Sequence, residues 1–299
     1  MNQFSSLISI IIPCYNCIEF LKKCINSLIM QTYSDFEVIV VNNASSDGLT
    51  EWYKNSKSPL KLQMINLNTN IGYAGGVNKG IENANGEIIL VLNSDIILNG
   101  NFMEEIAKYY VNYEIKNKDS QITHQGLNIN GKVLAFRILD KEGLKVESLG
   151  IYLSAFLRAK ESKSIREDIF PAGAAFAFKK DIISKIKNSH GTLYDERFFF
   201  LWEDIELGLR LKKNGIATVL LDTAICYHHG NSTNSNYFYK QYLSMRNRFY
   251  VISDYYRNYF IKYFHVVLFY DLPRLVFFLI SSPYKKAFFN HIKQKNPFF

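Results

Sequence analysis

The amino-acid sequence predicts an α/β protein with a mostly parallel, doubly wound central sheet. Short apolar, β-branched runs recur along the first 95 residues, patterns of helical period separate them, and polar clusters stand where the runs end. Strands that alternate with helices form parallel sheets, because a parallel pair needs a long crossover connection. Ligands of such sheets bind outside the carboxyl ends of the strands, so the polar clusters predict a site at one edge.

The first predicted strand covers residues 8–12 and ends at Pro13. Asn16 is then expected to cap a helix, because Glu19 follows three residues later in the pattern of a capping box. Apolar residues recur behind this cap at helical spacing and predict the buried face of the helix: Leu21, Cys24, Ile25 and Leu28.

Three further strands are predicted at 36–41, 62–65 and 87–92. A helix that carries Val77 and Ile81 precedes the last of them. Together with the turn after Pro13, polar or glycine-rich stretches at the ends of these strands give four clusters, which we expect at the same edge of the sheet. The stretches that follow the three strands are 42–48, 70–78 and 93–95.

The second half of the chain is less regular. Residues 116–168 are polar and poorly periodic, with a hairpin turn predicted at 128–131. Small residues at 171–178 predict a strand that lies close under a ligand. The remaining predicted elements are a helix that opens at Trp202 and ends at Gly215, and a strand over 216–221 that leads toward His228.

Charge is concentrated at the end of the chain, which is otherwise of ordinary globular composition, 48% hydrophobic and 21% charged. Residues 236–299 hold ten Lys or Arg, two acids and 21 of the 45 aromatic residues, whereas residues 1–235 carry no net charge. We therefore predict a domain over 1–235 and a basic, aromatic, helical extension over 236–299 that meets an anionic surface. The extension contains no readable recognition module, so nucleic acid is not expected as a partner.

An apolar run at 263–280 is interrupted by Asp271, Pro273 and Arg274. A membrane span needs about 20 mostly apolar residues without such charges, so the run is predicted to lie in a membrane interface. A helical homodimer interface is the alternative. Basic residues flank the aromatic side chains in this region and suit the level of lipid headgroups: Arg246, Arg248, Arg257, Lys262, Lys285, Lys286, Lys293 and Lys295.

The four cysteines do not have the spacing of a zinc module, and Cys14 and Cys24 occupy apolar positions. All four cysteines are therefore predicted to be reduced residues of the core, namely Cys14, Cys17, Cys24 and Cys226. The N-terminus has no basic start and only a short apolar run, unlike a secretory signal. We expect a cytoplasmic protein, associated peripherally with the inner face of the cell membrane.

The order of the polar motifs resembles that of family 2 glycosyltransferases, most of all the bacterial rhamnosyltransferases and galactofuranosyltransferases. The resemblance covers roughly residues 7 to 250 and implies a GT-A fold with an α-helical C-terminal extension. The matching motifs are Pro13-x-Tyr15-Asn16, Asn-x-Ser-x-Asp-Gly at 43–48, Asn70-x-Gly72 with Asn78, Asn93-x-Asp95, Trp202-Glu203-Asp204-x-Glu206, and His228.

The resemblance implies a nucleotide-sugar donor and a divalent cation, Mn²⁺ or Mg²⁺. A diphosphate leaving group develops negative charge that a cation stabilises, and hard cations prefer oxygen ligands. Asp95 and His228 are the implied metal ligands, although the adjacent His229 leaves the choice of histidine open, and Asn93 stands where a first carboxylate often occurs. The implied nucleotide-sugar-binding residues are Pro13, Tyr15, Asn16, Asn43, Asp47, Asn70, Gly72, Asn78 and Asn93.

On the acceptor side, the resemblance implies Asp204 as the general base, with Trp202 and Glu203 binding the acceptor. Carboxylates at a helix start are also favoured by the helix dipole, which is the purely structural interpretation. The implied reaction inverts the anomeric centre as a sugar moves from a UDP- or dTDP-sugar, dTDP-rhamnose included, to a hydroxyl of a lipid-linked oligosaccharide or polysaccharide.

Two other functions are alternatives to glycosyl transfer. A dehydrogenase is disfavoured because no Gly-x-Gly-x-x-Gly follows the first strand. A non-catalytic, membrane-associated protein that binds a sugar nucleotide remains the alternative.

Overall fold

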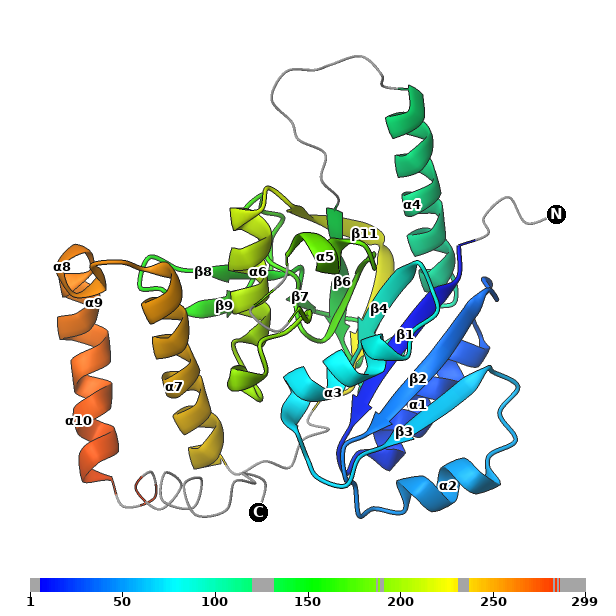
Figure 1. Ribbon diagram of the computed structural model, residues 1–299, viewed down its shortest axis with the longest axis horizontal. Helices are drawn as coiled ribbons and strands as arrows, with labels where there is room; N and C mark the ends of the chain where they lie inside the picture. Colours follow the sequence, from blue (N-terminus) through cyan, green and yellow to red (C-terminus); the bar gives the residue numbers. More distant parts are fainter. Residues whose placement is uncertain are drawn as a thin grey trace.

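In the computed structural model, residues 6–119, 132–186, 188, 191–230, 237–281, 283 and 285 are described. The described part contains a nine-stranded sheet with helices on both faces, and a set of helices at the end of the chain that lies beside it (Figure 1). The α/β class predicted from the sequence is confirmed. The hairpin predicted at 128–131 lies outside the described residues.

The first half of the chain alternates strands and helices as the periodicity predicts. Its elements are β1 (Ile8–Cys14), α1 (Ile18–Ile29), β2 (Phe36–Asn42), α2 (Leu49–Asn55), β3 (Leu62–Asn66), α3 (Gly72–Glu82), β4 (Ile88–Leu92), β5 (Ile96–Leu98) and α4 (Phe102–Asp119).

The second half holds shorter strands and the helices that close the molecule. Its elements are β6 (Lys132–Asp140), β7 (Val146–Ser148), β8 (Ile151–Leu153), β9 (Ala159–Glu161), β10 (Ala175–Lys179), α5 (Ile182–Lys185), the 3₁₀ turn η1 (Glu196–Phe198), α6 (Glu203–Lys213), β11 (Ala217–His228), α7 (Tyr237–Tyr255), α8 (Tyr259–Lys262), α9 (Phe264–Val266), the π-helical turn η2 (Val267–Asp271) and α10 (Leu272–Ile280).

The sheet has the strand order β3-β2-β1-β4-β10-β6-β11-β5, with β7 paired to β6. Strands β3, β2, β1 and β4 are parallel to one another, and so are β6 and β11. Strand β10 is antiparallel to both β4 and β6 and joins the two parallel sets. The parallel register aligns Cys14 of β1 with Asn42 of β2, so these two strands end side by side.

Alternate side chains of the central strands enter two separate cores, as the period of two requires. On β1, for example, Ile10 and Ile12 pack in the core that α1 and α4 cover, whereas Ile11 packs in the core that α3 and α6 cover. A strand buried on both faces is a continuous apolar run, which is why 8–12 was readable as a strand.

The prediction that Asn16 caps the first helix is wrong. Helix α1 begins at Ile18, and the Ile18 N–H donates to Asp47 Oδ2 at 2.8 Å, so the cap comes from the loop after β2. Asn16 instead has a left-handed φ of 51°, and its Oδ1 accepts from the Ser46 N–H at 2.8 Å. The backbone N–H at the start of α1 is therefore bonded by a side chain from another loop, and a local sequence pattern does not reveal such a contact.

The prediction of four reduced cysteines is correct for Cys24 and Cys226, which are buried thiols, and wrong for the other two. Cys14 and Cys17 form a disulfide, because the turn after β1 brings their Cα atoms to 5.9 Å, within the range for a bond. Burial raises the pKa of both free thiols far above the usual value, so neither is reactive.

The end of the chain packs α7 against α6, and α10 beside α7 (Figure 1). Asp271, at the centre of the apolar run, is buried, and its carboxylate pairs with Arg248 at 3.0 Å and accepts from the Tyr259 hydroxyl at 2.5 Å. Arg248 is only 3% exposed, so its predicted place among headgroup-facing basic residues is wrong. Among the described residues, no helix has the length and apolar character needed to cross a membrane.

Candidate active site

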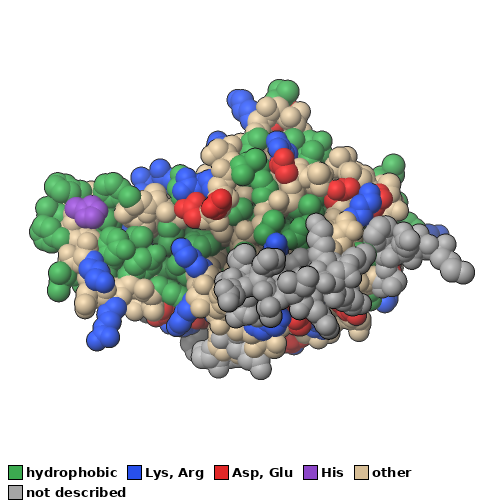
Figure 2. Space-filling view, turned by 90° about the horizontal axis from the view of Figure 1, so that it is seen from above, with side chains coloured by type: hydrophobic (Ala, Val, Ile, Leu, Met, Phe, Trp, Pro, Cys, Tyr) green, Lys and Arg blue, Asp and Glu red, His purple; other side chains and the backbone are tan. Residues whose placement is uncertain are grey.

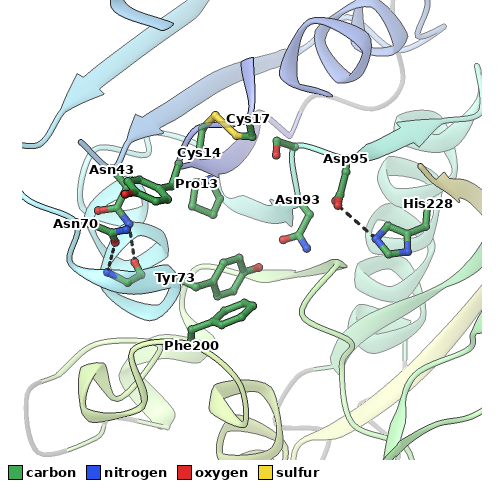
Figure 3. A pocket seen from close by; sticks show the side chains of 13 residues that line it. Pro13, Cys14, Cys17, Asn43, Asn70, Tyr73, Asn93, Asp95, Phe200 and His228 are labelled. Carbon is green, nitrogen blue, oxygen red and sulfur yellow. Dashed lines mark hydrogen bonds and ion pairs between the residues drawn. A yellow bond between two sulfur atoms is a disulfide. The ribbon is translucent and has the colours of Figure 1, made fainter. Parts of the chain in front are cut away.

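A cavity of about 210 Å³ opens at the edge of the sheet where β1, β2 and β4 end (Figure 3). Residues that directly follow these three strands form much of its wall, as expected for a parallel sheet. We call it the donor cavity. Its lining consists of Pro13, Cys14, Tyr15, Cys17, Asn43, Asn70, Gly72, Tyr73, Asn93, Ser94, Asp95, Phe200 and His228.

Asp95 and His228 face each other at one end of the donor cavity (Figure 3). Asp95 leads into β5 and His228 ends β11, and these strands pair with His228 opposite Ile96. His228 Nε2 lies 3.4 Å from Asp95 Oδ2, and His228 Nδ1 donates to Glu147 Oε2 at 2.7 Å. His229 does not line the cavity, so the geometry favours His228 over its neighbour.

The two carboxylates control the charge of this histidine. The hydrogen bond with Asp95 is the largest cause that raises the pKa of His228 to about 9, and Glu147 adds to it, although burial opposes the charge. A histidine that ligates a metal must be neutral, so a cation here would compete with a proton.

The donor set fits a cation that arrives with a nucleotide. Within the described part of the chain, no cluster of three His, Cys, Asp or Glu side chains is placed to hold a metal. Asp95 and His228 are two side chains of this cavity that could ligate a cation. Mg²⁺ is commonly held by one or two carboxylates together with phosphate oxygens of the substrate and water, and Asp95 would be the one carboxylate of such a set.

The loop before α3 is built by amide side chains that line the donor cavity. Asn43 Nδ2 donates to the Gly72 carbonyl at 2.9 Å, and Asn43 Oδ1 accepts from the Ile71 N–H at 2.9 Å. Asn70 Oδ1 accepts from the Gly72 N–H at 2.9 Å. These bonds direct the start of α3 at the cavity, where the helix dipole favours an anion.

Gly72 allows the loop before α3 to approach another segment. Its φ is +81°, and a Cβ atom there would lie 2.4 Å from the Phe199 carbonyl oxygen. Any other residue would therefore push the two segments apart.

Three residues predicted to bind the nucleotide sugar do not line the donor cavity. Asn16 and Asp47 hold the two loops around the start of α1 through the bonds described above. Asn78 lies on α3, where its amide bonds both the N–H and the carbonyl of Tyr194 and the Glu196 carboxylate. The other six, namely Pro13, Tyr15, Asn43, Asn70, Gly72 and Asn93, do line it.

A second cavity adjoins the first and shares Tyr73, Asn93 and Phe200 with it. We call it the acceptor cavity, after the role predicted for Trp202, Glu203 and Asp204. Asn93 lines both cavities, and its Oδ1 is buried without a hydrogen-bond partner among the described residues. The remaining lining residues are Ile151, Ala159, Lys160, Glu161, Gly173, Ala174, Leu201, Trp202, Glu203, Asp204 and Ser244.

The two acidic residues at the start of α6 differ in their surroundings. Glu203 is 4% exposed, and burial followed by the charge of Asp204 raises its pKa well above the usual value. Asp204 is half-buried, and desolvation raises its pKa to about 6 while backbone N–H donors from Ile205 and Gly173 oppose the shift. The pKa of Glu203 is therefore raised further than that of Asp204, which makes Asp204 the more readily ionised of the two and the better candidate to take a proton.

Several residues of the site were not predicted from the sequence. Tyr73 spans the boundary of the cavities, and its hydroxyl donates to the Gly173 carbonyl at 2.5 Å. Glu147 comes from the poorly periodic middle of the chain. Ser244, on α7, accepts from Trp202 Nε1 at 3.1 Å, although composition assigned it to the extension. Only Tyr73 had a signal, its place inside the glycine-rich stretch.

The chain resembles known proteins in both sequence and fold. Residues 9–186 match the family described as Glycosyl transferase family 2. The solved structure of residues 1–349 of Staphylococcus aureus TarS in complex with UDP superposes with a TM-score of 0.52 at 17% identity, over 85% of this chain and 74% of that one. The complex with UDP-GlcNAc gives a TM-score of 0.51 at 20% identity, over 81% and 65%. The predicted GT-A fold is confirmed.

Sequence relatives include enzymes of glycan synthesis. The low-salt glycan biosynthesis hexosyltransferase Agl10 of Haloferax volcanii is 28% identical over 81% of this chain and 74% of its own length. The amylovoran biosynthesis glycosyltransferase AmsB of Erwinia amylovora is 26% identical over 74% and 69%. The glycosyltransferase GlyA of Streptococcus pneumoniae is 32% identical over 36% of this chain, which spans only 15% of GlyA. The chain belongs to glycosyl transferase family 2.

Proposed function

We propose that this protein is an inverting glycosyltransferase that moves a sugar from a nucleotide-diphospho-sugar to an acceptor hydroxyl. The observation that carries the proposal is the pair of adjoining cavities. One contains a carboxylate and a histidine suited to a cation with a diphosphate, the other contains an ionised carboxylate, and they share Tyr73, Asn93 and Phe200. A donor and an acceptor would meet at that shared wall.

On the donor side, Asp95 and His228 would hold Mn²⁺ or Mg²⁺. The cation would neutralise the charge that develops on the leaving diphosphate. The amide-built start of α3 faces the same cavity and favours an anionic ligand, and Asn93 would contact the sugar from the wall that both cavities share. The nucleobase is open between uracil and thymine, and dTDP-rhamnose stays among the candidate donors.

On the acceptor side, Asp204 acts as the general base. Its carboxylate takes the proton of the acceptor hydroxyl as that oxygen attacks the anomeric carbon, and the bond to the diphosphate oxygen breaks on the opposite face. A single displacement of this kind inverts the anomeric centre. The adjacent Glu203, whose raised pKa makes it the weaker candidate for the base, would position the acceptor together with Trp202.

A lipid-linked oligosaccharide or a polysaccharide is the proposed acceptor class. The names of AmsB and Agl10 refer to the biosynthesis of amylovoran and of a low-salt glycan, which supports a glycan product. The resemblance to rhamnosyltransferases and galactofuranosyltransferases gives the first donors to test.

We also propose that the end of the chain binds an anionic membrane surface, on the inner face of the cell membrane. Figure 2 shows hydrophobic side chains gathered at the end of the molecule formed by α8 to α10, with Lys and Arg side chains beside them. We call this surface the apolar tail face. Its exposed side chains are Phe260, Ile261, Phe264, Leu268, Phe269, Leu272, Val276, Phe277 and Ile280.

The proposed activity is tested with a panel of UDP- and dTDP-sugars, each measured with and without Mn²⁺ after treatment with EDTA. A donor that binds only the native state raises the melting temperature, and release of the nucleoside diphosphate reports turnover. We expect one donor to stabilise the protein and to be turned over only with the cation. Asp95→Ala should abolish both effects and stay folded by circular dichroism, although loss of its pair with His228 lowers the unliganded melting temperature. Turnover that survives EDTA would contradict the metal assignment, and stabilisation without turnover, with acceptors present, would favour the non-catalytic alternative.

A further inference from the structure

The segment 199–202, which we call the wall loop, separates the donor and acceptor cavities. It joins η1 to α6 and carries Phe200, which lines both cavities, and Trp202, which lines the acceptor cavity. Figure 3 shows the Phe200 ring beside the Tyr73 ring at this boundary. Any shift of the wall loop therefore changes both cavities together.

The backbone of the wall loop is strained. Phe199 has φ 60° and ψ −60°, and the Phe200 N–H donates to the Phe198 carbonyl at 2.6 Å, which makes a γ-turn with a positive φ. Leu201 and Trp202 also have positive φ values, of 70° and 73°. Conformations of this kind persist only where the surroundings enforce them.

The side chain of Asn247, on α7, holds the wall loop in this conformation. Its side chain is fully buried, and its Nδ2 lies 2.7 Å from the Phe198 carbonyl oxygen, 2.9 Å from that of Phe200 and 2.6 Å from that of Leu201. Arg246 Nε donates to Asn247 Oδ1 at 2.9 Å, which fixes the direction of the amide. One side chain thus gathers three carbonyls of a strained turn.

The wall loop is held from the donor side as well. The Phe199 carbonyl accepts from the Ala74 N–H of α3 at 3.2 Å and occupies the space left by Gly72. Trp202 is fixed from α7 by the bond to Ser244. The loop is therefore clamped between α3, which faces the donor, and α7.

We infer that Asn247 is a positioning residue that sets the wall between donor and acceptor. The catalytic consequence rests on the proposed function, whereas the structural consequence does not. When the wall is displaced, water should reach the anomeric carbon more often. Its oxygen then bonds to that carbon, the bond to the diphosphate breaks, and the water proton passes to Asp204, so donor is hydrolysed in place of being transferred.

Asn247→Asp is the variant of choice, because it keeps the shape of the amide, while an ionised carboxylate cannot donate to the carbonyls and a protonated one can donate to only one of them. Ile252→Ala is the matched control. Ile252 is also buried on α7, but it packs with Leu157, Tyr259 and Val266 and has no part in either cavity. Both variants should lower the melting temperature, so lost stability alone cannot explain a difference in activity between them.

In the activity assay, we expect Asn247→Asp to lower kcat for transfer by about 10 to 10² and to raise the ratio of hydrolysis to transfer by about tenfold. The acceptor KM should rise, because Trp202 moves with the loop. Ile252→Ala should keep the ratio of the unsubstituted protein. If the ratio changes equally in both variants or in neither, Asn247 is only a structural residue.

A second readout does not depend on activity. The chain has two tryptophans, so Trp52→Phe leaves Trp202 as the single fluorescent reporter. In this background Asn247→Asp should shift the emission to longer wavelength and increase quenching by acrylamide, and Ile252→Ala should not. If no donor is turned over by the full-length protein, the proposed function fails while the Trp202 signal still decides the role of Asn247. An unchanged Trp202 signal in Asn247→Asp overturns the inference.

Discussion

At the scale of single residues, the two acids at the start of α6 make the proposed mechanism testable. Asp204→Asn keeps the shape of the side chain and removes the basic oxygen, so kcat should fall by about 10² to 10⁴, the usual contribution of a general base. Donor affinity, measured by calorimetry with Mn²⁺, should change little, because Asp204 lies in the acceptor cavity.

Glu203→Gln is the control for that substitution. Burial and the charge of Asp204 raise the pKa of Glu203 and disfavour its ionised form, so an amide of the same size should mainly raise the acceptor KM. If Glu203→Gln is inactive while Asp204→Asn turns over normally, the base is the neighbouring residue. If both variants only lower stability, the pair serves the helix start alone.

The pH dependence of kcat/KM gives a second test of Asp204. Its pKa is raised to about 6 by burial, and the base works only when it is ionised. At saturating Mn²⁺, which suppresses competition from the proton of His228, we therefore expect kcat/KM to be level above about pH 7 and to fall about tenfold per pH unit well below pH 6. The decrease of kcat/KM at acidic pH should be absent from the residual activity of Asp204→Asn, because that variant lacks the titrating carboxylate. A decrease of kcat/KM that begins only near pH 4 would instead indicate that the base is a solvated carboxylate.

At the scale of secondary-structure elements, the sequence predicts what is local and periodic. The buried strands were readable because both faces of each are apolar, and their polar ends fell together because the sheet is parallel there. Long-range contacts had no signal. Ser244 and Asn247 reach the wall loop across more than forty residues, from a helix whose composition suggested a surface extension. Asp47 likewise replaced the local cap at Asn16.

The contact of α3 with the sheet gives a prediction for one glycine. A Cβ atom on Gly80 would lie 2.3 Å from Ile11 Cγ2 and 3.2 Å from Val41 Cγ2. Alanine in a helix normally gains about 1 kcal/mol over glycine, but overpacking of this kind costs about 1–3 kcal/mol. Gly80→Ala should therefore lower the melting temperature. Gly75→Ala is the control, since its Cβ would meet only the Ile71 side chain, at 3.0 Å. A higher melting temperature of Gly80→Ala would mean that α3 lies further from the sheet.

At the scale of the whole molecule, the apolar tail face follows from how the last helices dock. The buried pair of Arg248 and Asp271 fixes the helices after α7 with one face inward. The opposite face keeps Phe264 and Phe269 exposed at 63% and 72%. Arg257 and Lys262 are exposed nearby, which adds attraction to anionic headgroups. Such a face needs a partner, because large exposed apolar patches are rare on monomers.

The last prediction concerns that partner. The triple variant Ile261→Ser, Phe264→Ser and Phe269→Ser removes exposed side chains and should leave the melting temperature unchanged. Each buried large apolar side chain contributes about 1.5–3 kcal/mol, so binding to vesicles rich in phosphatidylglycerol should weaken by at least about a hundredfold. The control variant Met30→Ser, Leu144→Ser and Ile165→Ser changes equally exposed apolar residues elsewhere and should bind like the unsubstituted protein. Binding should also weaken with salt, because exposed charges are screened. If the full-length protein ignores vesicles but sediments as a dimer that the first triple variant dissociates, a second copy covers the apolar tail face.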